Sequence, residues 1–371
     1  MLATTNLTQW ANYRWQDSPR GSSGWSSYGG QTIAAYHERQ DPEGSSSGSG
    51  VAVDLFLAPV ALGTETDGSI LCPAHRSNIV GIKPTVGLVS RDLVIPITER
   101  QDTVGPMART VRDAALLLGA IAGRDPNDSY TSDAPEGIDY LSACKDGALH
   151  GAKLGVPWKA IREETPGVEL AAFEKALESL KAAGAVIVDA DFAITHDELW
   201  KVERQVFQHD FPVNLATYLD AVEAPLRTLA EVRDATQKLS GEDYPAHNTK
   251  KWDIIVEGEY DNRNPEFAKI LEDFKVAGGR GLPHALKTFE LDAVIMPTSA
   301  APEWSAVVGY PAITVPLGKY PDDAKVKMDE WNELVETGPG VPFGFSFLGG
   351  RYEEEKLIGL AYDFEKLYGR Q

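Results

Sequence analysis

Two stretches rich in small and hydroxyl-bearing residues could carry nucleophilic chemistry. The first, GSSSGSG, covers residues 44–50, and the second, TDGSI, covers residues 66–70. A serine that follows a glycine turn at the end of a strand can expose its hydroxyl. The successive N–H groups of such a turn can also point at one spot, as stabilisation of an oxyanion requires. Ser69 is therefore a candidate nucleophile, although the residues alone also fit a simple strand-to-helix turn in which Ser69 is the N-cap.

The serine-rich first stretch allows three interpretations. It could be a flexible linker, but the run is short and patterned apolar sequence follows at once. A phosphate-binding loop requires a lysine and a Ser or Thr after the last glycine, and the run has neither. Residues 44–48 match G-x-S-x-G, which would make Ser46 the nucleophile of a Ser–His–Asp esterase. A nucleophile elbow follows a buried strand, however, and here the polar residues HERQDPE come first.

The residues that flank these stretches predict short, tightly packed elements. Residues 49–57 are mostly small and apolar, which suits a buried helix, and APVALGT at 58–64 suits a short buried strand. Residues 110–122 predict a helix that begins with a capping box of Thr110 and Asp113 and stops at Gly123.

Further along the chain, residues 153–188 predict a strand, a helix and a second strand. We expect Thr165 to be the N-cap of that helix, Pro166 its first residue and Gly184 its end. Such a unit usually forms a parallel pair of strands. Three apolar runs, LDAVIM, AITVPL and FGFSFL, suit further buried strands, and an amphipathic helix from about 353 to 368 closes the chain. The pattern predicts an α/β fold with a mixed sheet, in one domain over residues 1–371.

Composition excludes several classes of function. The 371 residues carry a net charge of −20, so nucleic acids and anionic membranes are poor partners, because both require a basic surface. The two cysteines, Cys72 and Cys144, exclude a disulfide scaffold and a cysteine-based zinc site, and no histidine or carboxylate cluster has metal-ligand spacing. We expect no cofactor and no membrane span, and a homodimer stays open. The compartment is unknown, with the cytoplasm as the default.

The sequence resembles the amidase signature family in both serine-containing stretches and in several segments outside them. The segments that carry the resemblance are GSSSGSGVAV, APVALGTETDGSILCPA, NIVGIKPTVGLVSR, QDTVGPMARTVRDAALLL, LDAVIMPTSAAP, VVGYPAITVPLG and VPFGFSFLGGRYEEEKLIGLAYDFE. The start, TTNLTQWANYR, resembles a segment that family members carry just before the serine-rich loop. The likeness spans nearly the whole chain and is weakest at about 190–280.

The resemblance implies a Ser–Ser–Lys triad on a single mixed β-sheet covered by helices on both faces. By position, Ser69 would be the nucleophile and Ser45 the bridging serine, whose preceding peptide bond is cis in the family. The backbone N–H groups of Thr66, Asp67, Gly68 and Ser69 would form the oxyanion hole. The implied function is cleavage of the C–N bond of a small carboxamide through an acyl-enzyme on Ser69.

The resemblance also implies a catalytic lysine upstream of the serine-rich loop, where this sequence has none. The first lysine is Lys83, in a segment that matches a non-catalytic part of the family. We therefore expect that an N-terminal part of the family domain is absent from this chain and that the chain is inactive as given. A catalytically silent amidase-like binding protein is the alternative. Leu71 stands where many members have an arginine, which favours apolar substrates.

Overall fold

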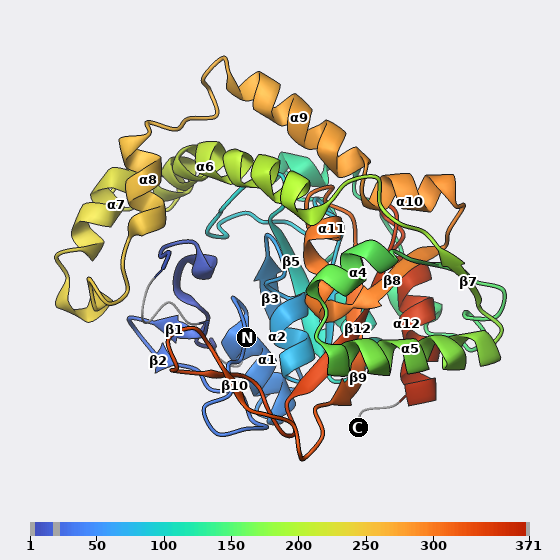
Figure 1. Cartoon of the computed structure of the whole chain (residues 1–371). Coiled ribbons are helices and arrows are strands. Elements are labelled where there is room, and N and C mark those ends of the chain that lie inside the picture. The colour runs from blue at the N-terminus through green and yellow to red at the C-terminus, as the bar shows by residue number, and fades with distance from the viewer. Residues whose placement is uncertain (1–3, 18–22, 369–371) are drawn as a thin grey trace.

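The central feature of the structure is an eight-stranded sheet in which the middle strands are buried on both faces (Figure 1). The structure is a computed structural model that describes residues 4–17 and 23–368. In spatial order, the strands of this sheet are β3 (Val60–Glu65), β5 (Thr103–Ala108), β4 (Val80–Lys83), β9 (Ala312–Lys319), β12 (Pro342–Leu348), β8 (Ala293–Pro297), β6 (Lys153–Val156) and β7 (Val186–Asp189).

The sheet is mixed, as the sequence predicts. Strand β6 pairs in parallel with β7 and β8, whereas the other neighbouring strands pair antiparallel. The apolar runs predicted as strands are β8, β9 and β12, and every residue of β8 and β12 is buried. The sequence of a strand covered on both faces is a continuous apolar run, because neither face is exposed to solvent and no alternating polar positions are needed.

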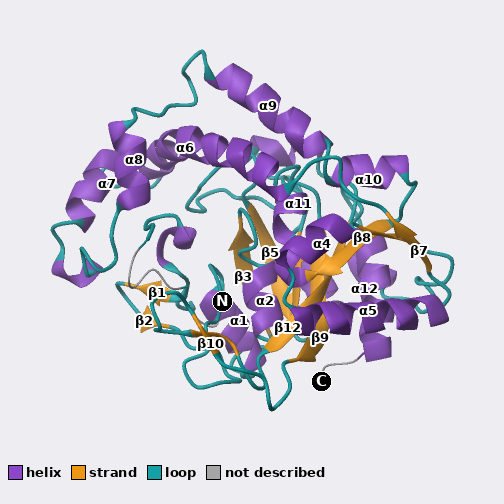
Figure 2. Ribbon diagram, viewed as in Figure 1, coloured by secondary structure: helices purple, strands orange, loops and turns teal. Residues whose placement is uncertain are grey.

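Two small hairpins and twelve α-helices complete the described chain (Figure 2). The hairpin strands are β1 (Trp25–Ser26), β2 (Gly30–Gln31), β10 (Lys327–Met328) and β11 (Val335–Thr337). The α-helices are α1 (Ser47–Asp54), α2 (Leu71–Arg76), α3 (Val111–Ile121), α4 (Trp158–Glu164), α5 (Gly167–Ala182), α6 (His196–Ala221), α7 (Leu229–Thr236), α8 (Lys250–Glu257), α9 (Phe267–Gly279), α10 (Leu282–Thr288), α11 (Pro302–Ala306) and α12 (Glu354–Tyr368). Short 3-10 turns lie at Gln9–Asn12, Ser129–Asp133, Tyr140–Ala143, Ser240–Glu242 and Thr298–Ala300.

One predicted helix start is wrong. Thr165 is not the N-cap of α5, because its N–H donates to the carbonyl of Ile161 and so ends α4, a helix that the sequence analysis did not predict. Pro166 has extended backbone angles and is the N-cap residue, so α5 begins at Gly167. The helix predicted at 110–122 is confirmed as α3, with the Thr110 hydroxyl accepting the N–H of Asp113.

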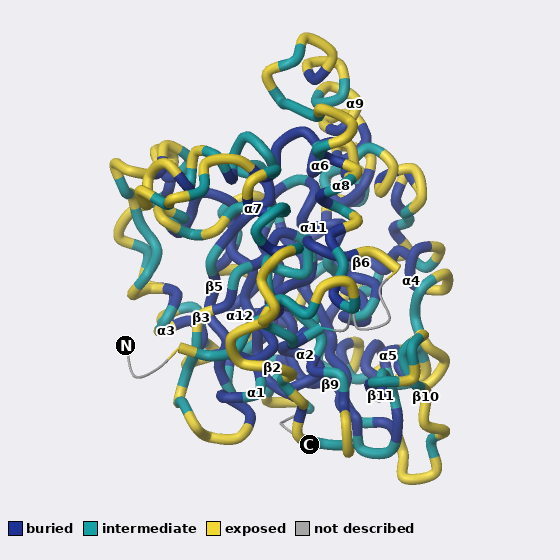
Figure 3. Tube along the Cα trace, turned by 90° about the vertical axis from the view of Figure 1, so that its left-hand side faces the viewer, coloured by how far each residue is buried: buried dark blue, intermediate teal, exposed yellow. Residues whose placement is uncertain are grey.

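The apolar core is divided between the sheet and a separate helical group. The main cluster lies on the sheet and includes α3, α5 and α12. A second cluster packs α6, α7 and α8 against the segment around Trp10 and Tyr13. Helices α6 to α9 lie together on one side of the molecule, beyond the sheet (Figure 1), and the trace through the centre is buried (Figure 3). No helix within residues 4–17 and 23–368 has the length and apolarity that a membrane crossing needs.

Two glycines provide a matched test of this packing. At Gly105, on β5, an added Cβ would lie 2.0 Å from the backbone oxygen of Ile82, which cannot move without breaking the sheet. At Gly119, exposed on α3, an added Cβ meets nothing within 4 Å. We expect Gly105→Ala to lower the free energy of unfolding by about 2–3 kcal/mol through overpacking. Gly119→Ala should raise it by about 0.5–1 kcal/mol through helix propensity. Denaturant titration measures both, and equal stabilities for the two variants would contradict the described contact.

Candidate active site

The structure brings the two serine-containing stretches together through a backbone hydrogen bond. The N–H of Ser46 donates to the carbonyl of Ser69 over 3.1 Å. The peptide bond between Gly44 and Ser45 is cis, as the resemblance implies. Ser45 and Ser69 are both buried, and Gly44 and Ser69 line one cavity. The two serines that the sequence analysis selects are therefore adjacent in the fold.

Each serine is held at the start of a helix. Ser45 precedes α1, and its carbonyl accepts the N–H of Thr8 over 2.9 Å. Ser69 lies in the turn between β3 and α2. The close packing of α1 explains its run of small residues: at Gly48 an added Cβ would lie 2.5 Å from the backbone oxygen of Asn6.

The turn before Ser69 is shaped by one glycine and one carboxylate. Gly68 has a φ of +80°, and an added Cβ would lie 2.8 Å from the Cys72 sulfur, so both backbone and space favour glycine. A carboxylate oxygen of Glu65 accepts the N–H groups of Ile70 and Leu71 over 2.7 and 2.9 Å. Glu65 thereby fixes the chain on the far side of Ser69.

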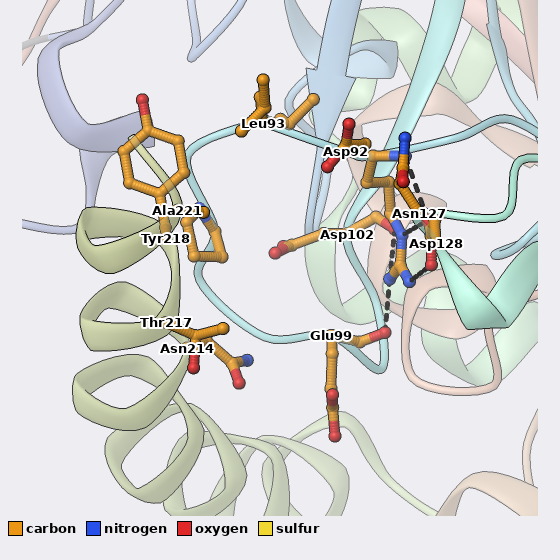
Figure 4. Close-up of a pocket in the computed structure, with 13 residues that line it drawn as sticks. Asp92, Leu93, Glu99, Asp102, Asn127, Asp128, Asn214, Thr217, Tyr218 and Ala221 are labelled. Atoms are coloured by element: carbon orange, nitrogen blue, oxygen red, sulfur yellow. Dashed lines mark hydrogen bonds and ion pairs between the residues drawn. The ribbon is translucent and has the colours of Figure 1, made fainter. Parts of the chain in front are cut away.

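Asp102 braces the other side of the same turn. One carboxylate oxygen accepts the hydroxyl of Thr66 over 2.6 Å, and the other accepts the N–H groups of Ile97 and Thr98. Asp102 also lines a smaller cavity of about 260 Å³, between its own loop and the end of α6 that carries Asn214 and Thr217 (Figure 4). Asp102 therefore holds the loop against the turn that contains Thr66.

Buried acidic groups gather beneath Asp67. Burial and, to a smaller extent, the nearby carboxylates of Glu303 and Glu65 raise the pKa of the Asp67 carboxyl to about 8. Burial also raises the pKa of Glu203, whose carboxylate accepts the side-chain amide of Gln101 over 2.6 Å. His196 is hydrogen-bonded to Glu303, and chiefly this bond raises its pKa to about 9. In this group Asp67 and Glu203 are therefore largely protonated and neutral at pH 7, and His196 carries a positive charge beside Glu303.

The cavity above Ser69 has a volume of about 720 Å³. Thr66, Asp67 and Ser69 form part of its wall, and α6, α8 and the N-terminal segment supply most of the rest. The lining residues are Ala11, Asn12, Tyr13, Gln16, Gly44, Thr66, Asp67, Ser69, Ile97, Trp200, Arg204, Phe207, Gln208, Lys251, Ile254 and Tyr260. This size and mixture suit a small organic ligand with aromatic or aliphatic parts and a few polar groups.

An unusual backbone conformation shapes the N-terminal wall of the cavity. Trp10, Ala11 and Asn12 have φ values of 55°, 50° and 64°, and such left-handed residues cost roughly 1–2 kcal/mol each. Contacts with α8 hold the turn: the Trp252 indole N–H donates to the carbonyl of Tyr13 over 2.6 Å, and its ring meets that of Trp10. Residues in such conformations persist where their surroundings enforce them, and they cluster at functional sites.

Other residues considered from the sequence lie elsewhere. The Ser46 hydroxyl exchanges hydrogen bonds with the backbone of Thr64, an arrangement that does not support a Ser–His–Asp site there. Lys83 is fully buried on β4, where burial lowers its pKa to about 8 and its amino group donates to the carbonyl of Pro84. His75 is paired with Glu43. Leu71 is fully buried in the main core and does not line the cavity, so its identity does not set substrate polarity as the sequence analysis expected.

The arrangement of possible metal ligands and cysteines can be read from the structure. Within the described part of the chain, no group of three or more His, Cys, Asp and Glu side chains could hold a metal ion. Cys72 and Cys144 are both free thiols.

Comparison with known proteins identifies the family. The model of the family named Amidase matches residues 1–305. The chain belongs to the Amidase family. A candidate amidase of Arthroderma benhamiae is 45% identical over 99% of this chain and 62% of its own length, and a probable amidase of Arabidopsis thaliana is 34% identical over 99% and 67%. The chain therefore spans about two thirds of the length of these relatives.

A solved structure from the same family has the same fold. The peptide amidase of Stenotrophomonas maltophilia superposes with a TM-score of 0.86 and 37% identity, over 100% of this chain and 74% of the other. The family resemblance and the mixed-sheet fold expected from the sequence are both confirmed.

Most of the cavity wall was not predicted from the sequence. Trp200, Arg204, Phe207 and Gln208 all come from α6, in the region where the resemblance is weakest. Their spacing of four, seven and eight residues from Trp200 places them on one face of a helix, which is a signal that the sequence contains. No signal in the sequence connects that face to Ser69, because the contact forms only in the tertiary structure.

The raised pKa of Asp67 predicts a pH-dependent stability. The folded chain holds this proton up to about pH 8, whereas an aspartate in the unfolded chain releases it near pH 4. The stability that Asp67 contributes is therefore complete below about pH 4 and is lost as the pH rises through about 8. Asp67→Asn should flatten the decline in the free energy of unfolding between pH 5 and 9 by on the order of 1–2 kcal/mol, since the half-buried side chain is partly screened.

Denaturant titration at several pH values measures this effect. Asp273→Asn, at an exposed carboxylate on α9, is the control and should leave the decline unchanged. A decline that is equally steep in the Asp67→Asn variant would refute the assignment of a neutral Asp67.

Proposed function

We propose that this chain is a serine amidase by type, whose reaction is cleavage of the C–N bond of a small carboxamide through an acyl-enzyme on Ser69. The observation that carries the proposal is the bond from the Ser46 N–H to the Ser69 carbonyl, which holds the stretch that contains Ser45 against Ser69, at a cavity lined by Gly44 and Ser69. Membership of the Amidase family and the similarity to a peptide amidase support the reaction class.

In this proposal the hydroxyl of Ser69 attacks the amide carbonyl carbon. An amide is a weak electrophile with a poor leaving group, so the attacking hydroxyl must lose its proton and the departing amine must gain one. Ser45 relays the proton from Ser69 and returns it to the amine. Negative charge develops on the carbonyl oxygen, and the N–H groups of Thr66, Asp67, Gly68 and Ser69 donate to it. Each such donor stabilises the transition state by about 2.7–4 kcal/mol. Water then hydrolyses the ester on Ser69.

The proton acceptor beyond Ser45 is a lysine in the triad that the resemblance implies. The sequence has no lysine before Ser45, and the first one, Lys83, is buried away from the cavity. We therefore propose that the 371 residues by themselves turn over amides slowly at most. Saturable binding of amides without any product is the outcome that would favour the alternative, a silent amidase-like binding protein.

Substitution of the two serines tests the roles. Ser69→Ala should abolish any slow release of ammonia from N-acetyl-phenylalaninamide by the chain, since it removes the nucleophile. Ser45→Ala should lower the same slow rate, as loss of a proton relay does. Ser49→Ala is the matched control. Its hydroxyl is buried on α1, where it donates to the carbonyl of Leu62 and is hydrogen-bonded to the Thr5 hydroxyl, and it does not line the cavity, so the rate should be unchanged.

Covalent labelling provides a second test that does not require turnover. A fluorophosphonate should modify Ser69, because the reagent traps activated serines. Cleavage after Glu43 and Glu65 separates residues 44–65 from the segment that contains Ser69, whereas cleavage at arginines leaves both stretches in one peptide. An adduct on residues 44–65 would contradict the assignment of the nucleophile and favour a serine of the first stretch.

A further inference from the structure

Two cations line the cavity above Ser69. Arg204 is on α6 and Lys251 on α8, and both lie near the ring of Tyr13. The Lys251 amino group is 5.2 Å from the centre of that ring, and the charge of Arg204 acts on the Tyr13 hydroxyl. These two helices pack together with α7 and Tyr13 in the second core cluster, which fixes where the cations stand.

Neither cation is neutralised by a carboxylate within the described chain. The Lys251 amino group donates to the carbonyl oxygen of Asn12 over 3.2 Å, and Arg204 makes no ion pair among residues 4–17 and 23–368. Arginines in the interior are paired: Arg14 with Glu242 and Arg91 with Asp128, at 2.6 and 2.8 Å. Arg204 is exposed, so water solvates its charge without a partner. Lys251 is half-buried, and an unpaired ammonium there is unfavourable unless something else supplies the opposite charge.

The nearby acidic groups do not supply that charge. Glu203 precedes Arg204 in the chain, but it is fully buried and bound to Gln101, on the inner face of α6. Asp67 is the one carboxyl among the lining residues, and burial with neighbouring carboxylates raises its pKa to about 8. The cavity of a protein with a net charge of −20 is therefore locally positive.

The rest of the wall suits the apolar body of a ligand. Trp200, Phe207 and Tyr260 supply aromatic rings, and Ile97 and Ile254 supply aliphatic surface. A guanidinium and an ammonium bind a carboxylate through charge-assisted hydrogen bonds, and the planar fork of arginine matches the two carboxylate oxygens. The Tyr13 hydroxyl, whose pKa burial raises, stays protonated and can donate a third bond.

We propose that the amide bound at this site carries a carboxylate, which Arg204, Lys251 and the Tyr13 hydroxyl bind while the amide lies over Ser69. The inference rests on the proposed function, because it takes the cavity above Ser69 as the substrate site. It replaces the expectation of an apolar substrate with one that has an apolar body and an anionic end.

A binding experiment keeps this inference separate from the chemistry at Ser69. The probes are the N-malonyl, N-succinyl and N-glutaryl derivatives of phenylalaninamide and the methyl ester of each, titrated by calorimetry into the Ser69→Ala protein at pH 7. The three lengths vary the distance from amide to carboxylate. We expect at least one acid to bind about tenfold or more tightly than its ester, which corresponds to one charge-assisted contact.

Substitution of the cations tests the assignment. Arg204→Gln should reduce the preference for acid over ester by about fivefold and leave the affinity for the ester within about twofold, because Arg204 holds no other group. Lys251→Met should reduce the preference likewise. Lys201→Gln is the matched control, since Lys201 is exposed on the same helix and does not line the cavity.

Two results would overturn the inference. One is equal affinity of acid and ester, or no saturable binding of any acid, for all three lengths. The other is an acid preference that Arg204→Gln leaves unchanged. Failure of the proposed function looks different: the native chain would then keep its preference for the acids but would show neither hydrolysis nor a fluorophosphonate adduct on Ser69.

Discussion

The hydrogen bond between the Ser46 N–H and the Ser69 carbonyl is the contact on which the site depends. It joins a loop before α1 to a turn after β3, and neither segment could hold a reacting serine in register with the other by itself. Packing around it leaves little freedom: glycine is required at position 48 against Asn6 and at position 68 against Cys72. The small residues of both stretches therefore allow the two backbones to approach closely, and the proposed serine chemistry depends on that approach.

Carboxylates set the rigidity and the electrostatics of the turn. Glu65 and Asp102 hold it from opposite sides by accepting backbone N–H groups and the Thr66 hydroxyl. Asp67 and Glu203 are kept largely neutral by burial and mutual repulsion. A neutral Asp67 does not oppose negative charge that develops above Ser69, whereas an ionised one would. A protonated, neutral Asp67 is therefore favoured both by the stability of the fold and by the proposed chemistry.

The helices α6 and α8 and the left-handed turn at Trp10–Asn12 form most of the cavity wall opposite Ser69. The strained turn is held by Trp252 and contributes Tyr13 and Asn12 to the wall. Arg204 and Lys251 face the same space from helices outside the sheet. The family motifs lie on the sheet side and the residues proposed to select the substrate on the helical side, so the two can vary separately.

The sequence by itself determined the strands β8, β9 and β12, the helix α3 and the family, because continuous apolar runs, a capping residue and long motifs are local signals. It also singled out Ser45 and Ser69. It did not determine the start of α5, where α4 ends at Thr165, since competition between adjacent helices is decided by packing. Only the tertiary structure joined Tyr13, Arg204 and Lys251 at one cavity. Residues so far apart in the chain meet through the burial of α6 and α8, and that contact leaves no local pattern.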